Sequence, residues 1–218
     1  MAFDEWCLEN GPDEPVFYLW RNRPSVIVGL NQAICSEVNL DYLRAHGILP
    51  VRRVTGGGAV YHDLQNMNYT FAGPLGSVSP ESFAEALRSL GLEAELTGRN
   101  DIFVQGRKVS GYARRVWRNR EIVHGTFMYD VDIDTLTAAL DVPGSKLERK
   151  GIKSVRSRVT NVRDFLLPRF GSLDEVQAVL QDYFAAGDGE ITLTAEQDAE
   201  IQRIADLKFA TEDWIFKA

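Results

Sequence analysis

Three consecutive glycines constrain this chain more than any other stretch of its sequence. They lie within the segment Arg52-Arg53-Val54-Thr55-Gly56-Gly57-Gly58-Ala59-Val60-Tyr61-His62-Asp63. Each glycine costs about 0.5–1 kcal/mol relative to alanine inside a helix or strand, so three together predict a bend. The flanking residues 49–51 and 59–61 are strand-like, and a glycine bend between strands can take positive φ and let a ligand approach its N–H groups. Two arginines enter the bend, which favours an anionic or carboxylate-bearing ligand over a plain glycine hairpin.

The glycine spacing excludes two familiar phosphate-binding motifs. A Walker loop requires Gly-Lys-Ser/Thr after its last glycine, and a dinucleotide fingerprint requires a different glycine spacing. Residues 54–59, called the glycine loop below, match neither pattern. We therefore expect an anion site of another type.

The composition is that of one domain. At 218 residues the chain can bury a sizeable single core, and we expect one domain over residues 1–218. No apolar run approaches the roughly 20 residues of a membrane span, and the acidic N-terminus is not that of a signal peptide. Cys7 and Cys35 have no metal-ligand spacing and are expected to be free thiols. These features predict a cytoplasmic protein without a membrane partner.

Positive charge is concentrated in two segments of an otherwise acidic chain. The net charge is −7, yet seven of the 24 lysines and arginines lie in residues 99–120 and eight in residues 146–169. Such runs are often only solvated faces. Two of them in one acidic protein favour convergence on a phosphate ligand or an acidic partner. A pI near 5.1 argues against nucleic acid as the partner.

The hydrophobic pattern predicts an α+β fold with mixed, largely antiparallel sheets flanked by helices. A hairpin is expected from residues 16–20 and 25–30, joined by the turn at 21–24. Further strands are expected over residues 68–71, 93–104, 108–113 and 122–129. Helices are expected over 2–10, 39–45 with Asn39 as its cap, 80–91 with Pro80 as first helical residue, 134–142, 161–167 capped by Thr160, 173–185 and 195–207.

Lys108 is the most informative residue outside the glycine loop. It follows the turn at residues 105–107 and precedes Val109 on an alternating strand, so the two side chains should face opposite sides. A lysine beside a glycine loop can place a compact charge against a phosphate or a carbonyl oxygen. Taken alone, however, Lys108 reads as an exposed strand lysine.

Three further places carry polar side chains suited to ligand binding. Asn100 and Asp101 start a strand, where Asp101 can hold Mg²⁺, orient a lysine or simply cap a turn. His124 lies in an apolar strand and taken alone reads as a hydrogen-bonded core residue, since the three histidines lack zinc-ligand spacing. The basic residues 150–161 end at an expected helix N-terminus, which suits an anion. No Ser-His-Asp or Cys-His arrangement stands out.

Five ordered motifs together resemble one enzyme family. They are Arg-Arg-x-Thr-Gly-Gly-Gly-Ala-Val-Tyr-His-Asp (52–63), Gly-Arg-Asn-Asp (98–101), Arg-Lys-Val-Ser-Gly-x-Ala (107–113), His-Gly-Thr (124–126) and Lys-Gly-Ile-x-Ser-Val-Arg-Ser-Arg-Val-Thr-Asn (150–161). This set closely resembles the lipoate–protein ligases of the biotinyl/lipoyl ligase–transferase fold, and the resemblance runs from about Ala2 to Trp214.

The resemblance implies a two-step reaction. Lipoate and ATP would give lipoyl-adenylate and pyrophosphate, and a lysine of a lipoyl domain would then accept the lipoyl group. The acceptor would be an E2 subunit of a 2-oxoacid dehydrogenase or the H protein of glycine cleavage. Catalysis would be mainly positioning and electrostatic stabilisation, with no protein nucleophile.

The resemblance also assigns roles to residues. Lys108 would be catalytic, touching the lipoyl carbonyl and the α-phosphate. Arg53 and residues 58–61 would contact the nucleotide, Gly56 and Gly57 would flank the acyl chain, and residues 150–161 would fold over the adenylate. Asn100 would support the nucleotide, and Asp101 the nucleotide or Mg²⁺. The implied substrate-binding set is Arg53, Gly56, Gly57, Gly58, Ala59, Val60, Tyr61, Asn100, Asp101 and His124.

Two departures from the family pattern leave alternatives open. Gly29-Leu30-Asn31-Gln32 lacks the arginine that usually follows this glycine. The sequence stops near Trp214, where many relatives continue into an accessory domain linked to adenylation, which leaves the first half-reaction open unless a separate small subunit supplies that part. The alternatives are an ATP-independent lipoyl or octanoyl transferase and a non-catalytic lipoate or nucleotide binder. Related octanoyl transferases use a later cysteine, and Cys7 and Cys35 do not fit that position.

Overall fold

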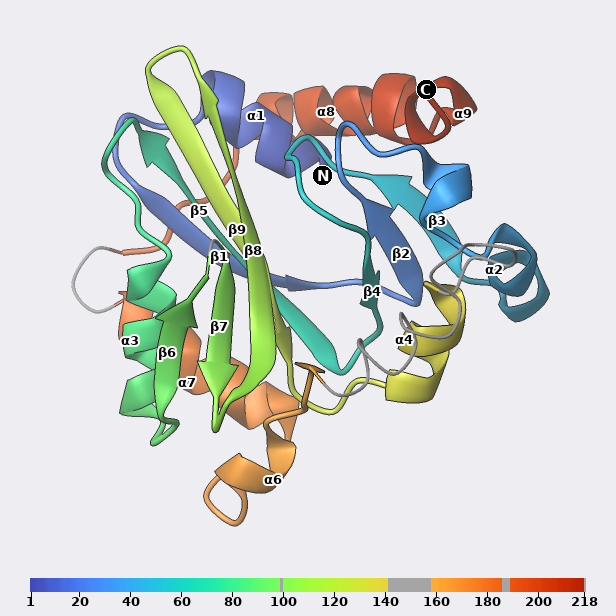
Figure 1. Ribbon diagram of the computed structural model, residues 1–218. Coiled ribbons are helices and arrows are strands. Elements are labelled where there is room, and N and C mark those ends of the chain that lie inside the picture. Colours follow the sequence, from blue (N-terminus) through green and yellow to red (C-terminus); the bar gives the residue numbers. More distant parts are fainter. Residues whose placement is uncertain (99, 141–157, 186–188, 218) are drawn as a thin grey trace.

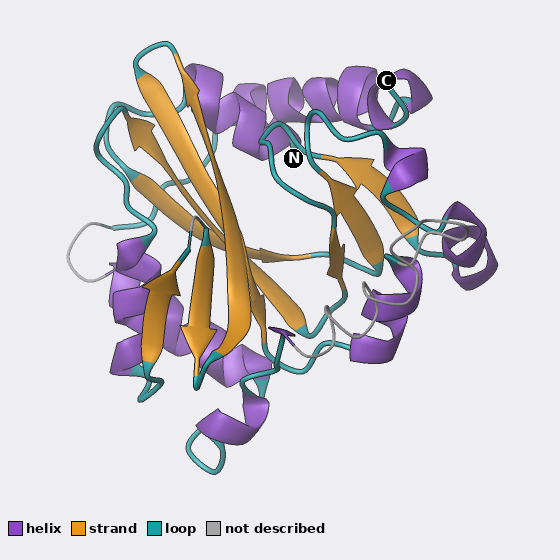
Figure 2. Ribbon diagram, viewed as in Figure 1, coloured by secondary structure: helices purple, strands orange, loops and turns teal. Residues whose placement is uncertain are grey.

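Two β-sheets of unequal size form the centre of the protein. The computed structural model describes residues 1–98, 100–140, 158–185 and 189–217. The larger sheet has the order β1 (Val16–Arg21), β5 (Asn66–Pro74), β9 (Arg120–Met128), β8 (Arg107–Trp117), β7 (Asp101–Val104) and β6 (Ala94–Thr97). All of its pairings are antiparallel. The smaller sheet has the order β3 (Leu49–Arg52), β2 (Ser25–Val28) and β4 (Val60–His62), with β2 and β3 parallel. The two sheets lie side by side (Figures 1 and 2).

Helices cover the sheets in separate groups. The helices of the described residues are α1 (Ala2–Asn10), the 3-10 turn η1 (Ile34–Ser36), α2 (Leu40–His46), α3 (Glu81–Ser89), α4 (Ile133–Ala139), α6 (Arg163–Leu166), α7 (Leu173–Ala185), α8 (Ala195–Ile204), the π-helical turn η2 (Ala205–Phe209) and α9 (Glu212–Ile215). Helices α3 and α7 pack on the larger sheet around Phe83, Phe127 and Leu180. Helices α2 and α4 pack with the smaller sheet around Leu43, Val26 and Leu136. None of the described helices is long and apolar enough to cross a membrane.

The structure confirms the α+β prediction and most of the expected elements. The side chain of Asn39 accepts a hydrogen bond from the Tyr42 N–H, and Gly47 ends the helix at φ 64°. A left-handed residue there is the usual end of a helix, and glycine adopts it without a Cβ penalty. Cys7 and Cys35 are free thiols, as predicted.

The predicted hairpin of residues 16–30 is wrong. Strand β1 pairs with β5 in the larger sheet, whereas β2 is the central strand of the smaller one. All four residues of β2 are buried, so this strand needs hydrogen-bonded partners along both edges, which β3 and β4 supply. Residues 22–24 therefore carry the chain from one sheet to the other.

Two predicted helix starts also need correction. Pro80 precedes α3 as its N-cap and is not its first helical residue. The cap of α6 is Val162 and not Thr160, whose backbone N–H donates to the Lys108 carbonyl (2.9 Å). A residue so engaged belongs to the edge of β8, and the helix begins only after the chain has left that strand.

Candidate functional site

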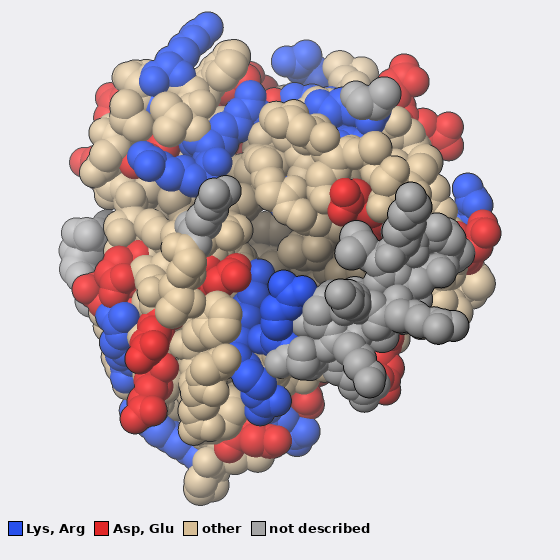
Figure 3. All heavy atoms as spheres, in the orientation of Figure 1, with Lys and Arg blue, Asp and Glu red and all other residues tan. Residues whose placement is uncertain are grey.

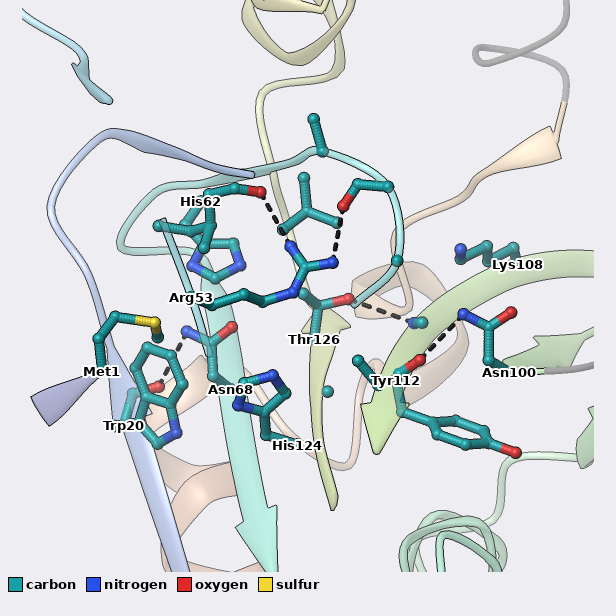
Figure 4. Close-up of a pocket in the computed structure, with 18 residues that line it drawn as sticks. Met1, Trp20, Arg53, His62, Asn68, Asn100, Lys108, Tyr112, His124 and Thr126 are labelled. Carbon is teal, nitrogen blue, oxygen red and sulfur yellow. Dashed lines mark hydrogen bonds between the residues drawn. The ribbon is translucent and has the colours of Figure 1, made fainter. Parts of the chain in front are cut away.

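A cavity of about 120 Å³ opens between the two sheets. Figure 3 shows the hollow, with lysine and arginine side chains at its edge. Its lining residues come from both sheets, from the glycine loop and from the N-terminus. They are Met1, Trp20, Ile27, Arg53, Gly57, Gly58, Ala59, Val60, His62, Asn68, Asn100, Lys108, Gly111, Tyr112, Ala113, His124, Gly125 and Thr126. In Figure 4, Lys108, Asn100 and Tyr112 lie on one side, Trp20 and His62 on the other, and Arg53 between them.

Arg53 holds the glycine loop in shape. Its Nη2 donates to the carbonyls of Gly56 (2.7 Å) and Gly58 (2.8 Å), and its Nη1 donates to the Ile27 carbonyl (3.0 Å). The side chain is buried, and burial lowers the pKa of Arg53 to about 10, so it remains charged at neutral pH. A buried guanidinium that faces the cavity while ordering the loop around it places fixed positive charge at the site.

Only one of the three glycines is required by backbone conformation. Gly57 has φ 94°, and a Cβ there would lie 2.8 Å from Nη2 of Arg53. The same loop also requires Gly29, because a Cβ at that position would come within 2.1 Å of the Gly57 carbonyl oxygen. At Gly56 and Gly58 a Cβ would meet open space. Their lack of a side chain leaves room beside the cavity without relieving backbone strain.

This difference predicts unequal effects of alanine substitutions. Gly57→Ala should lower the free energy of unfolding by about 1–2 kcal/mol, the cost of a left-handed residue that carries a Cβ. Gly58→Ala should leave stability unchanged and weaken binding of an adenylate ligand, because only a bound ligand would meet the new methyl group. Thermal melts with and without ligand check both. A stable Gly57→Ala would contradict the conformational argument.

Lys108 lies at the cavity wall and pairs with Asp101. Their Nζ and Oδ1 atoms are 2.7 Å apart, and the Lys108 side chain is 30% exposed. The lysine extends over Gly111, where a Cβ would lie 2.7 Å from Nζ. The strand register shifts at Ile102/Phe103, directly opposite this part of β8. Such an irregularity redirects a side chain, which places Lys108 in the cavity while Val109 is buried on the other face, as predicted.

Asn100 and the end of the basic segment meet close to Lys108. Asn100 Nδ2 donates to the Tyr112 carbonyl (2.9 Å), which fixes its amide beside the cavity. Val159 forms a parallel bridge with Lys108. Residues 141–157, which hold most of the basic loop predicted to cover the adenylate, lie outside the described residues. Of the described end of this segment, Val159 and Thr160 contact the backbone of Lys108.

Tyr61 and His62 are adjacent on β4, so their side chains face opposite sides of the strand. Tyr61 is buried in the core of the smaller sheet, and its side chain does not line the cavity. Val60 and His62 line it instead, since alternate residues of β4 share a face. The predicted contact of residues 58–61 with the nucleotide stays a prediction, and the structure adds His62 to the residues that line the cavity. Gly56 borders a neighbouring hollow with Gly57 and Arg114.

His62 lines the cavity and has a ring nitrogen that is unpaired among the described residues. Asn22 Nδ2 lies 3.1 Å from Nδ1, and because the amide donates, the ring proton sits on Nε2. Nε2 is buried and has no hydrogen-bond partner within the described part of the chain. Burial, followed by the charges of Arg53 and His124, lowers the pKa of His62 to about 3, so the ring is neutral.

The basic residues described in 99–120 differ in their relation to the cavity. Of the described basic residues in 99–120, Lys108 lines it. Arg114 pairs with Glu121, and Arg115 donates to the Val54 carbonyl (2.9 Å) and stacks on Trp117. Both arginines thus have partners within the protein, and the predicted convergence of the two basic segments stays a prediction, because residues 141–157 lie outside the described residues.

A magnesium site made by protein carboxylates alone is not found in the described ranges. They contain no group of three or more His, Cys, Asp or Glu side chains arranged around a metal position. Asp101 provides a single carboxylate at the cavity edge, engaged by Lys108. The ion pair places Asp101 so that it orients Lys108, and its ability to hold Mg²⁺ stays a prediction.

Comparison with known proteins agrees with this geometry. Residues 1–185 match the lipoyl protein ligase A/B catalytic domain. The chain is 39% identical to the lipoate–protein ligase LplJ of Bacillus subtilis over 226 residues, which cover 98% of this chain and 68% of that protein.

Solved structures extend the likeness to the fold. The bipartite lipoate protein ligase of Thermoplasma acidophilum, described with its E2 lipoyl domain, matches with a TM-score of 0.86 and 33% identity over 99% of this chain and 89% of that one. A lipoate–protein ligase A bound with ATP matches with a TM-score of 0.82 and 31% identity over 99% of this chain and 92% of that one. Sequence and structure agree over nearly the whole chain, so this protein belongs to the lipoate–protein ligase family and carries its lipoyl protein ligase A/B catalytic domain.

Proposed function

We propose that this chain activates lipoate with ATP and transfers the lipoyl group to a lysine of a lipoyl domain. A lipoate carboxylate oxygen attacks the α-phosphorus of ATP, and the bond to pyrophosphate breaks. The amine of the acceptor lysine then attacks the acyl carbonyl, loses a proton and expels AMP. The observation that carries the proposal is Lys108, a lysine aimed into a cavity beside the glycine loop. The ATP-bound relative supports the nucleotide as co-substrate.

The residues around the cavity suit positioning and charge stabilisation. The Lys108 ammonium neutralises charge that develops between the acyl carbonyl and the α-phosphate. Arg53 adds a fixed charge, and the exposed backbone of Gly57 and Gly58 leaves room for phosphate or acyl atoms. Mg²⁺ in nucleotide sites is usually held by one or two carboxylates together with substrate phosphates, and Asp101 supplies one such carboxylate. The cavity-lining residues include no cysteine, which disfavours a cysteine-dependent transferase.

We further propose that a second polypeptide assists adenylation. The Thermoplasma acidophilum relative is a bipartite ligase, and this chain covers 89% of the matched chain. The acceptor we propose is a lipoyl domain such as that of an E2 subunit or the glycine cleavage H protein.

One mass-spectrometric assay tests these proposals. Protein, ATP, Mg²⁺, lipoate and an apo lipoyl domain are incubated together and with each component left out in turn, and a second series supplies lipoyl-AMP. We expect lipoylation from lipoyl-AMP, and lipoylation from lipoate only when ATP and the second polypeptide are both present. Modification without ATP from an acylated donor protein would support the transferase instead. Failure with lipoyl-AMP would overturn the proposed transfer step.

A further inference from the structure

The glycine loop is connected to helix α1 by a row of buried side chains. His124 Nδ1 lies 3.0 Å from Oδ2 of Asp4, and His124 Nε2 lies 2.7 Å from Oγ1 of Thr55. The same hydroxyl oxygen accepts from Nε of Arg53 (3.0 Å). Arg53 in turn donates to the carbonyls of the glycine loop. We propose that the buried carboxylate of Asp4 is a positioning group that sets the conformation of this loop from outside the cavity.

The hydrogen-bond directions along this row follow from its Asp4 end. The ionised Asp4 carboxylate only accepts, so Nδ1 of His124 carries a proton and donates it to Asp4. In the neutral ring Nε2 then accepts the Thr55 hydroxyl proton, and the Thr55 oxygen accepts from Nε of Arg53. One tautomer of His124 and one orientation of the Thr55 hydroxyl satisfy all partners at once. Hydrogen bonds linked in this way strengthen one another and hold the side chains rigidly.

Asp4 is fully engaged and cannot exchange its partners with water. Its side chain is 2% exposed, and Tyr18 and Thr70 also donate to its Oδ1. Burial alone would raise the pKa of Asp4, but the N-terminal amine and the hydrogen bonds from His124 and Tyr18 hold it below its ordinary value. A charged carboxylate at this end of the row fixes the His124 tautomer. Carboxylates that accept from the free ring N–H of metal-bound histidines act in the same way.

The other end of the row reaches the cavity. Besides the Arg53 bonds, the Leu30 N–H donates to the Thr55 carbonyl (2.7 Å), which ties the loop to the end of β2. His124 and Arg53 themselves line the cavity. A displacement of Thr55 therefore moves both the charged guanidinium and the loop backbone. Because reactions between bound groups lose about 10² in rate for a 1 Å misplacement, the row bears on adenylation, and this consequence rests on the proposed function.

Paired variants at Thr55 separate positioning from packing. Thr55→Val keeps the volume and removes the hydroxyl, whereas Thr55→Ser keeps the hydroxyl. Thr70→Val is the matched control, because the buried Thr70 hydroxyl also donates to Asp4 (3.3 Å) but is not a member of this row to the loop. We expect kcat for adenylate formation to fall about 10²-fold in Thr55→Val and in Asp4→Asn. Thr55→Ser and Thr70→Val should stay within about threefold of the wild-type rate, because both keep the hydrogen bonds that run from Asp4 through His124 and residue 55 to Arg53.

Two measurements without substrate decide the inference independently of activity. Amide hydrogen exchange at residues 56–58 should accelerate in Thr55→Val and Asp4→Asn but not in Thr55→Ser or Thr70→Val. Nitrogen-15 NMR of the imidazoles should show the Nδ1–H tautomer for His124. Equal loop exchange in Thr55→Val and Thr70→Val, or an Nε2–H tautomer, would overturn the positioning role. Wild-type protein that makes no adenylate even with the second polypeptide would instead overturn the proposed function, while the exchange data still decide the inference.

Discussion

Lys108→Ala is expected to keep the fold and lose adenylate formation by about 10²–10³-fold, the typical cost of removing one preorganised charge donor. The lysine reaches the cavity from β8 and has no core packing to lose. Its ion pair with Asp101 is partly exposed on both sides, and such pairs contribute about 0–1 kcal/mol. The free energy of unfolding should therefore change by less than about 1 kcal/mol, measured by circular dichroism melts.

Two control variants sharpen this test. Lys108→Arg should rescue poorly, because Nζ lies only 2.7 Å from where a Cβ at Gly111 would fall, and a larger planar guanidinium cannot take the place of the compact ammonium there. Arg107→Ala, one residue earlier and exposed, should keep both half-reactions near normal. Adenylation and transfer are measured separately for each variant, using supplied lipoyl-AMP for the second. Near-normal rates of both steps in Lys108→Ala would remove this lysine from the mechanism.

Local signals predicted local structure well. The Asn39 cap, the Gly47 end of α2 and the bend at Gly57 follow from side-chain hydrogen bonding and positive φ, which depend on a few adjacent residues. Lys108 and Val109 face opposite sides because strand alternation is equally local. These rules were sufficient to find the loop and to place Lys108 on the face opposite Val109, whereas the catalytic role of the lysine was implied by the family resemblance.

Pairing and burial depended on distant residues and could not be predicted in the same way. Nothing between β1 and β2 shows that each pairs with strands far along the sequence. His62 required both the alternation of β4 and knowledge of which face meets the cavity. The connection from Asp4 to Thr55 joins residues separated by much of the sequence through His124, and no spacing rule predicts it.

Arg52 is the clearest case in which position in the sequence misleads. Beside Arg53 at the entrance of the glycine loop, it reads as a second ligand-binding cation. It is instead fully buried and donates to carbonyl oxygens within the protein. Its acceptors are Gly29 (2.9 Å), Leu30 (3.2 Å), Gln32 (2.6 Å), Trp214 (3.0 Å), Ile215 (3.1 Å) and Lys217 (3.0 Å). The indole of Trp214 returns a bond to the Arg52 carbonyl (3.0 Å), so this arginine fastens residues 214–217 to the turn after β2.

Arg52→Met should therefore lower the free energy of unfolding by about 3–5 kcal/mol, since several buried carbonyls lose a charged donor and each costs about 1–3 kcal/mol before water reaches it. At about 2–4 °C per kcal/mol for a chain of this size, the melting temperature should fall by about 10 °C. Hydrogen exchange should accelerate in residues 211–217 and in the turn at 29–32. Arg44→Met is the matched control, because Arg44 is an exposed arginine of α2 that pairs with Asp41 (3.0 Å).

The effect of Arg52→Met should also reach the site. The turn at 29–32 contacts the glycine loop, with Gly29 packed against Gly57 and the Leu30 N–H bonded to the Thr55 carbonyl. Loosening that turn should raise amide exchange at residues 56–58, well below the melting temperature. Arg52→Lys should not restore it, because three donors on a flexible stem cannot span acceptors on two separate segments. Unchanged amide exchange in residues 211–217 and in residues 29–32 would show that the carbonyl oxygens are satisfied without the guanidinium. Arg52 would then not be the group that joins residues 214–217 to the site.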